Sequence, residues 1–212
     1  MDVFDPVLGN GCCTPGAKSI TWHPIKTATN GQLALGMTRW IIENKAYNAD
    51  YLGFTNYKAA VAGGFASYTG ATFLVIDDES SANNGKLMTA ADAGLTEPEA
   101  DPAAKTKPTY YVVMDAEKNE AALNTDAERG LIDFEGEVNG IKVRSAFLYL
   151  KDSAFSNTMD EYAETCGVPR ETIEDVAREF TSHGVKAATT GLGSTAAANG
   201  VSSMAAYTFL NA

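Results

Sequence analysis

The sequence predicts an α/β protein in which helices cover both faces of a mainly parallel sheet, giving three layers. The first observation is an amphipathic helix near 32–45, whose apolar side chains have the i, i+4, i+7, i+8 spacing of a stripe that packs on a sheet: Leu33, Met37, Trp40 and Ile41. The second is the continuous apolar run of residues 71–76 (ATFLVI), which is typical of a buried strand. The third is a strand, a glycine-rich turn and a helix over 186–211.

Composition limits the classes of partner. The chain has 212 residues and a formal net charge of −11, with its acidic residues scattered along the sequence. This balance argues against nucleic acid and against an anionic membrane surface. No apolar run approaches the roughly 20 residues that cross a bilayer, and the opening MDVFDPVLG lacks the features of a signal peptide.

Cysteine and histidine are too few and too badly spaced to predict a metal centre. Cys12 and Cys13 are adjacent, and Cys166 is distant from both, so no Cys-x-x-Cys site can form. His23 and His183 are also far apart in sequence. His183 stands before a glycine at the predicted end of a helix, where a cation-capable residue is common.

The N-terminal elements place polar groups at element ends. Val3 and Phe4 predict a short strand that ends at Asp5-Pro6. An acid at a strand tip can bind a ribose or a base, and it can equally be a solvated loop residue. Thr29 and Gln32 have the spacing of a capping box, so the helix should start there. The loop before it could hold an anion or a ring edge against the free N–H groups of the helix.

Residues 70–143 have the character of a strand-rich insertion whose side chains serve packing rather than chemistry. The strongest hairpin signal is Asn139-Gly140, and this hairpin should lie off the main sheet. The elements predicted in and just before the insertion are a short helix over 56–64, strands over 71–76, 86–89 and 109–114, an exposed connection over 94–108, and hairpin strands over 131–134 and 141–143.

The C-terminal third is helical. Thr158 and Glu161 form a capping-box pattern, and Pro169 restarts a helix after Gly167. The remaining predicted elements are a helical stretch over 144–155, a helix over 169–182 with Ile173, Val176, Ala177 and Phe180 on one face, a strand over 186–190, the turn 191–200, and a helix over 203–211. From its residues alone, the turn 191–200 is as consistent with a flexible loop as with a ligand-binding turn.

Two stretches of the sequence resemble a known protein family. WHPIKTATNGQLALGMTRWIIENKAYNADYL, residues 22–52, resembles the PI-x-PGTD-x-AL loop and helix of the molybdopterin oxidoreductases of the dimethyl sulfoxide reductase family. The run VRSAFLYLKDSAFSNTMDEYAETCGVPRETIEDVAREFTSHGVKAA, residues 143–188, is similar to the tetrathionate-reducing branch of that family. The two stretches occur in the order and at the spacing of that branch.

The resemblance implies a Rossmann-like domain that holds one guanosine arm of a bis-molybdopterin guanine dinucleotide cofactor. It implies a single domain over 1–212, internal to a larger subunit, whose upstream part carries a 4Fe-4S cluster. Asn30 departs from the family pattern, because the family has an acid there and an amide oxygen accepts fewer guanine N–H bonds. The residues matched to the cofactor-binding positions are Asp5, Pro6, Trp22, Pro24, Thr27, Thr29, Asn30, Ser194, Thr195, Asn199 and Gly200.

The resemblance also implies a function for the whole enzyme. It would reduce tetrathionate to thiosulfate in anaerobic respiration, in the periplasm. Its partners would be a membrane anchor subunit and an iron–sulfur electron-transfer subunit. The segment alone would be inactive. The alternatives are the same domain from a thiosulfate, polysulfide or arsenate reductase, and a non-catalytic α/β binding or interaction module.

Overall fold

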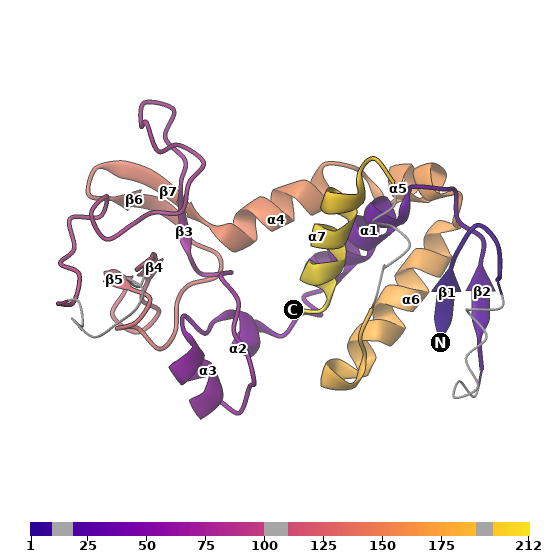
Figure 1. Cartoon of the computed structure of the whole chain (residues 1–212), viewed down its shortest axis with the longest axis horizontal. Helices are drawn as coiled ribbons and strands as arrows, with labels where there is room; N and C mark the ends of the chain where they lie inside the picture. Colours follow the sequence, from indigo (N-terminus) through magenta and orange to yellow (C-terminus); the bar gives the residue numbers. More distant parts are fainter. Residues whose placement is uncertain (10–18, 100–109, 190–196) are drawn as a thin grey trace. The chain divides into compact units, whose positions relative to one another are not determined.

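A computed structural model of the chain describes residues 1–9, 19–99, 110–189 and 197–212 (Figure 1). The chain divides into two compact units: unit 1 is Met1–Tyr47 with Lys151–Ala212, and unit 2 is Asn48–Leu150. Unit 2 contains the predicted strand-rich insertion 70–143. The described part holds seven α-helices and several small sheets, which confirms the mixed α/β class. The interpretation of 1–212 as one domain of a larger subunit stays a prediction.

The elements of unit 1 are β1 (Asp2–Phe4), β2 (Thr21–His23), α1 (Asn30–Glu43), α5 (Met159–Cys166), α6 (Arg170–Ser182), the 3₁₀ turn η2 (Gly184–Lys186) and α7 (Gly200–Leu210). Those of unit 2 are α2 (Ala49–Leu52), α3 (Tyr57–Ala62), β3 (Leu74–Ile76), β4 (Val112–Met114), β5 (Ala121–Leu123), β6 (Glu135–Val138) and β7 (Ile141–Ser145). Helix α4 (Ala146–Phe155) lies across the boundary in sequence. No helix in the described ranges has both the length and the apolar character needed to cross a bilayer.

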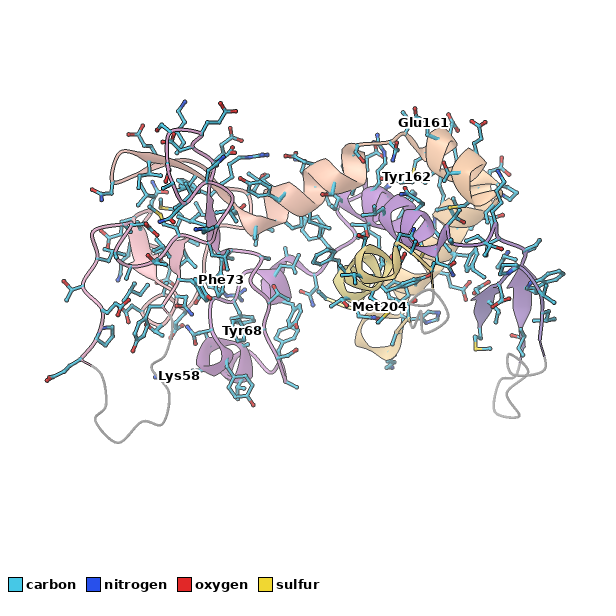
Figure 2. The ribbon with its side chains drawn as sticks, turned by 45° about the horizontal axis from the view of Figure 1, so that its top comes forward. Lys58, Tyr68, Phe73, Glu161, Tyr162 and Met204 are labelled. Carbon is cyan, nitrogen blue, oxygen red and sulfur yellow. The ribbon has the colours of Figure 1, made fainter. Side chains whose placement is uncertain are left out.

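Helix α1 is the centre of unit 1, and α5, α6 and α7 all pack on it (Figure 1). Leu33, Met37 and Ile41 are buried as the stripe predicts, whereas Trp40 is only partly buried. The stripe packs on helices, so the prediction that it docks on a sheet is wrong. Apolar side chains of α5, α6 and α7 fill the space beside the stripe, and a glycine of α1 lets one of these helices approach closely. At Gly36, for example, an added Cβ would lie 3.3 Å from the Cβ atom of Tyr162 on α5 (Figure 2).

The described strands form three small sheets. β1 and β2 pair in parallel, with Val3 opposite Trp22. β3, β7 and β6 form an antiparallel sheet in that order, and β4 pairs antiparallel with β5. Among the described residues only β1 and β2 are parallel, so they do not form the mainly parallel sheet that the sequence predicts.

The strand predicted from Lys186 is wrong over residues 186–189. Lys186 ends the 3₁₀ turn, and its N–H donates to the carbonyl of His183 at 3.2 Å. Ala187 N–H donates to the carbonyl of Gly184 at 3.2 Å. These local bonds use the donors that a ladder would need. The predicted end of the strand, residue 190, lies outside the described residues.

The hairpin of unit 2 is confirmed. Asn139 and Gly140 both have positive φ, 51° and 76°, as a type I′ turn requires, and Val138 pairs with Ile141. The strand predicted over 131–134 is wrong, because β6 begins at Glu135. The hairpin also joins the strand that was predicted from the apolar run 71–76, because β7 pairs with β3.

Several local predictions of element ends need only small corrections. Strand β3 begins at Leu74, β4 begins at Val112, and residues 86–89 contribute isolated bridges rather than a strand. Asn56 caps α3 as its side chain accepts from Ala59 N–H at 2.9 Å. Helix α6 follows Pro169, and α7 begins at Gly200, three residues before its predicted start.

The capping box of α5 is confirmed and generates a prediction. Thr158 N–H donates to Glu161 Oε2 at 2.7 Å, and Glu161 N–H donates to Thr158 Oγ1 at 3.2 Å. Replacing Thr158 by Ala should lower the free energy of unfolding by about 1 kcal/mol, the typical value of an N-cap. Urea denaturation at neutral pH measures this change in the free energy of unfolding. The matched control is Thr125→Ala, because Thr125 is exposed and caps no helix.

The same cap should depend on pH. Bonds from the Thr158 backbone and hydroxyl lower the pKa of Glu161 below its ordinary value. A lowered carboxyl pKa contributes stability that is present above the unfolded pKa and is lost as the pH falls through the folded pKa. The difference between Thr158→Ala and the parent chain should therefore shrink in acid. A difference that stays constant down to pH 2 would contradict this assignment.

Candidate functional site

The first turn of α1 lacks the cap that its sequence predicts. Thr29 is at the N-cap position but makes no side-chain bond to the helix, and its hydroxyl donates to the carbonyl of Lys26 at 2.7 Å. The predicted Thr29–Gln32 capping box is therefore wrong, because the hydroxyl closes the preceding turn. In the described part of the chain, the N–H groups of Asn30 and Gly31 have no hydrogen-bond acceptor. They are free to bind a ligand.

The N-terminus of α7 meets the same loop. Asn199 is the N-cap residue of α7, yet its side chain makes no cap bond. Its Nδ2 instead donates to the carbonyl of Ala28 at 3.0 Å, across 171 positions of sequence. Ala28 has a φ of 65°, a left-handed conformation that disfavours residues other than glycine. Ala28 stands where the family motif has its glycine.

Gly31 sets how closely α1 and α7 approach. A Cβ at this position would lie 2.7 Å from Ser203 Oγ and 3.0 Å from Ser203 Cα. Gly31, Gly200 and Ser203 are all buried. Only a residue without a side chain fits here, so the first turns of the two helices lie against each other.

The end of α5 holds the other side of the loop. Lys26 N–H donates to the carbonyl of Cys166 at 2.8 Å, and Lys26 Nζ donates to the carbonyl of Glu164 at 2.7 Å. The Lys26 ammonium thus lies at the negative end of α5, where a cation is favoured. Cys166 Sγ in turn contacts the carbonyl of Thr29 at 3.6 Å.

Two buried groups beside the loop stay uncharged. Burial raises the pKa of the Tyr207 hydroxyl, more than a hydrogen bond with the Asn30 side chain lowers it. Burial likewise raises the pKa of the Cys166 thiol, against the smaller opposite effects of Thr29 and Lys26. Cys166 is therefore a packing residue rather than a reactive thiolate.

Asp5, Pro6 and Trp22 form a second group at the ends of β1 and β2. Asp5 Oδ1 accepts from Val7 N–H at 3.0 Å, and the Asp5 carbonyl accepts from Trp22 Nε1 at 2.9 Å. Trp22 is 42% exposed. Pro6 is also exposed.

The sequence-predicted residues thus fall into two groups in unit 1. The first joins Thr27, Thr29 and Asn30 to Asn199 and Gly200 at the ends of α1 and α7. The second contains Asp5, Pro6 and Trp22, and Pro24 follows β2 on the way to α1. In the described ranges no hydrogen bond connects the two groups directly. Ser194 and Thr195 lie outside the described residues.

Sequence reasoning missed three residues of the first group: Lys26, Ala28 and Tyr207. Ala28 had a usable signal, because it occupies a glycine position of the motif and a glycine there suggests positive φ. Lys26 and Tyr207 had none, since their partners lie on α5 and α1, far away in sequence.

Unit 2 contains an open hollow of about 400 Å³, bordered by Asp77, Glu135, Glu137, Lys142 and Arg144. Arg144 lies between Glu135, at 3.3 Å, and Asp77, at 4.0 Å. Arg144 is therefore paired with two of the three carboxylates that border the hollow. In the ranges that the structure describes, no three His, Cys, Asp or Glu side chains are grouped so that they could hold a metal ion.

Comparison with known proteins gives clear relatives. The chain is 35% identical over 206 residues to a tetrathionate reductase subunit of Salmonella typhimurium, covering 90% of this chain and 18% of that protein. It is 36% identical over 173 residues to a selenate reductase subunit of Mesobacillus selenatarsenatis, covering 81% of this chain and 16% of that protein. A tetrathionate reductase subunit of Archaeoglobus fulgidus is 28% identical over 166 residues, 76% of this chain and 13% of that protein. The chain thus spans less than a fifth of the length of these relatives. No protein-family model matches it.

The close approach at Gly31 predicts a steric effect. Gly31→Ala should lower the free energy of unfolding by roughly 1–3 kcal/mol, the usual cost of overpacking. Adding Ser203→Ala removes the contact with Oγ and should recover part of this loss. Gly9→Ala is the matched control, because a Cβ there has nothing within 4 Å. Equal denaturation midpoints for Gly31→Ala and the parent would show that the helices do not meet at this residue.

The left-handed conformation of Ala28 predicts that a glycine at this position stabilises the protein. Ala28→Gly should raise the free energy of unfolding by about 0.5–1 kcal/mol, since left-handed backbone costs an alanine about 1–2 kcal/mol and glycine loses about 0.5–1 kcal/mol through its unfolded-state entropy. Ala205→Gly inside α7 should instead destabilise by about 1 kcal/mol. Thermal or urea unfolding of both variants measures this, and destabilisation by Ala28→Gly would mean that position 28 is not left-handed.

Proposed function

The chain is homologous to a segment of the molybdopterin enzymes of the dimethyl sulfoxide reductase family, and we propose that it forms part of the cofactor-binding region of a reductase's catalytic subunit. The ligand would be one guanosine arm of a bis-molybdopterin guanine dinucleotide. The observation that carries this proposal is the meeting of the α1 and α7 N-termini around the Ala28–Asn199 bond. It occurs within the loop that matches the family's motif.

The physics of helix ends supports a phosphate ligand. Each helix N-terminus has an effective charge of about +0.5 and several N–H groups that point out of the helix. Two such ends lie together here, and small residues surround them: Gly31, Gly200 and Ser203. Phosphate groups bind at helix ends of this kind.

The residues at the site fit a nucleotide arm in part. Thr27, Thr29 and Asn30 would bind the base side of the ligand, with Asn199 and Gly200 opposite. Asp5 and the exposed Trp22 would contact the sugar or base from the second group, beside Pro6 and Pro24. Ser194 and Thr195 belong to the same proposal through the family match. The fit is reduced at Asn30, because an amide accepts fewer N–H bonds than the family's carboxylate.

The chain's residues would bind and orient the cofactor and keep water from it, while the bound molybdenum cofactor itself supplies the electron transfer to substrate. Tyr207 positions Asn30, and Lys26 fixes the loop to α5. Because Tyr207 and Cys166 keep their protons at neutral pH, they add no negative charge that would repel a phosphate.

The parallel pair β1–β2 supports a Rossmann-like domain that is completed by other parts of the subunit. Parallel strands occur almost only in sheets covered on both faces, and a two-stranded sheet by itself is marginal. The other described strand pairs are antiparallel and belong to unit 2. The additional parallel strands would therefore come from the rest of the subunit, which would also hold the 4Fe-4S cluster.

For substrate, the proposal is tetrathionate, which accepts two electrons and gives two thiosulfates as its central S–S bond breaks. The relatives named as tetrathionate reductases are 35% and 28% identical, and one named as a selenate reductase is 36% identical. Identity alone therefore does not choose between these two substrates. The enzyme would act in anaerobic respiration in the periplasm, and its partners would be a membrane anchor and an iron–sulfur subunit. Thiosulfate, polysulfide and arsenate are the further candidate substrates.

Metal and nucleotide analysis of the intact subunit tests the proposal. We expect molybdenum, and guanine nucleotide released by acid hydrolysis in a 2:1 ratio to molybdenum, together with oxidation of reduced viologen by tetrathionate. A higher kcat/KM with selenate would keep the cofactor proposal and change the substrate. Absence of both molybdenum and guanine would favour a non-catalytic interaction module.

Asn30→Asp tests the site at the level of one residue. Restoring the family's carboxylate should raise molybdenum occupancy, or leave it full while slowing cofactor loss, because the carboxylate accepts both N–H groups of the base edge. Asn84→Asp makes the same chemical change in unit 2 and should have no effect. Faster cofactor loss from Asn30→Asp would contradict the placement of the base beside this residue.

A further inference from the structure

The outer face of α7, formed by Val201, Met204, Ala205, Thr208 and Phe209, is apolar and exposed. Val201 is 88% exposed, Phe209 is 48% exposed, and Met204 is 37% exposed; Met204 is labelled on this helix in Figure 2. Ala205 and Thr208 are exposed as well. Thr208 Oγ1 donates to the carbonyl of Met204 at 2.9 Å, so its polar group is satisfied within the helix.

The opposite side of α7 is already buried in unit 1. Ala206, Tyr207 and Leu210 belong to the core that includes Leu33 and Met37 of α1. Helix α7 therefore has apolar side chains on both its buried and its exposed side, and residues 197–212 contain no charged side chain. A helix of this composition is normally buried on every side. Its exposed half is the unusual feature.

Helix α6 shows how this chain makes a helix that faces water. It buries Ile173 and Ala177, while its outer side carries ion pairs. Arg170 Nε pairs with Glu174 at 2.6 Å, and Arg178 pairs with Asp175. Since α6 and α7 belong to the same unit, the lack of charge on the outer face of α7 is a local property and not a feature of the whole surface.

We propose that the outer face of α7 is an internal docking surface, covered in the intact subunit by an apolar sheet or helix face from outside these 212 residues. This inference rests on the proposed function, in which the chain is one segment of a larger subunit. The relatives are long enough to supply the cover, because the chain matches only 13–18% of their length. The β1–β2 pair independently indicates that further elements of the subunit join unit 1.

Methionine oxidation of the intact subunit provides a first test with the native residue. Under limited peroxide, Met204 should oxidise as slowly as Met37 and Met88, which are 5% and 0% exposed. The reference is the same subunit unfolded in urea, in which all three should react alike. Oxidation of Met204 at the unfolded rate when the protein is native would overturn the proposal.

Photo-crosslinking identifies the segment of the subunit that contacts the outer face of α7. p-Benzoylphenylalanine in place of Val201 should crosslink within the subunit to peptides outside this chain, as mapped by mass spectrometry. The matched control places the same group at Glu179 on the charged side of α6, whose side chain is 65% exposed, and should give few crosslinks. Crosslinks from position 201 to residues 48–150, or to a second copy of the subunit, would overturn the proposal.

A negative charge at position 201 tests whether the outer face of α7 is buried against another part of the subunit. Val201→Asp should expose Met204 to oxidation and lower the subunit's resistance to limited proteolysis, whereas Glu179→Ala should change neither. Because these readouts do not use the cofactor, protected Met204 in a subunit without molybdenum would refute the proposed function and keep the docking surface. Slow oxidation of Met204 in Val201→Asp would instead count against the docking surface.

Discussion

Helix α1 can lie against α7 only because residue 31 has no side chain. The space that a Cβ would need is filled by Ser203, whose Cα would be 3.0 Å away. This contact places Asn199 beside Ala28, and the bond between them joins segments 171 residues apart. The end of α5 holds the same loop from the other side through Lys26. The candidate site therefore depends on a packing constraint before it depends on any polar group.

The chemistry of the site depends on backbone N–H groups at the helix N-termini that no side chain caps in the described part of the chain. Thr29 and Asn199 stand where caps belong, yet each bonds to the loop instead of its helix. The N–H groups at a helix N-terminus need an acceptor from outside the helix, which can be water or an anion. The loop also keeps a left-handed Ala28, a local cost that is common at functional sites.

Local signals in the sequence were reliable where no competing local hydrogen bond formed. The α5 capping box and the Asn139-Gly140 turn each depend on residues close in sequence, and each forms as predicted. The stripe of α1 is buried at Leu33, Met37 and Ile41, but it packs on helices and Trp40 is only partly buried. The Thr29 cap failed because its hydroxyl found Lys26. The strand at Lys186 failed because a 3₁₀ turn used its donors. In the site, the cofactor-binding roles of Asp5, Trp22 and the Thr27–Asn30 loop stay predictions. The contacts of Lys26 and Tyr207 required the tertiary structure, because their partners are far away in sequence.

We expect the two helix N-termini in unit 1 to bind a phosphate-containing ligand in the intact subunit. An experimental structure of that subunit, purified with its cofactor, tests it most directly. We expect phosphate oxygens within hydrogen-bond distance of the N–H groups of α7's first turn, with the base edge beside Asn30. This expectation would be contradicted by a cofactor bound elsewhere, with these N–H groups capped by protein side chains.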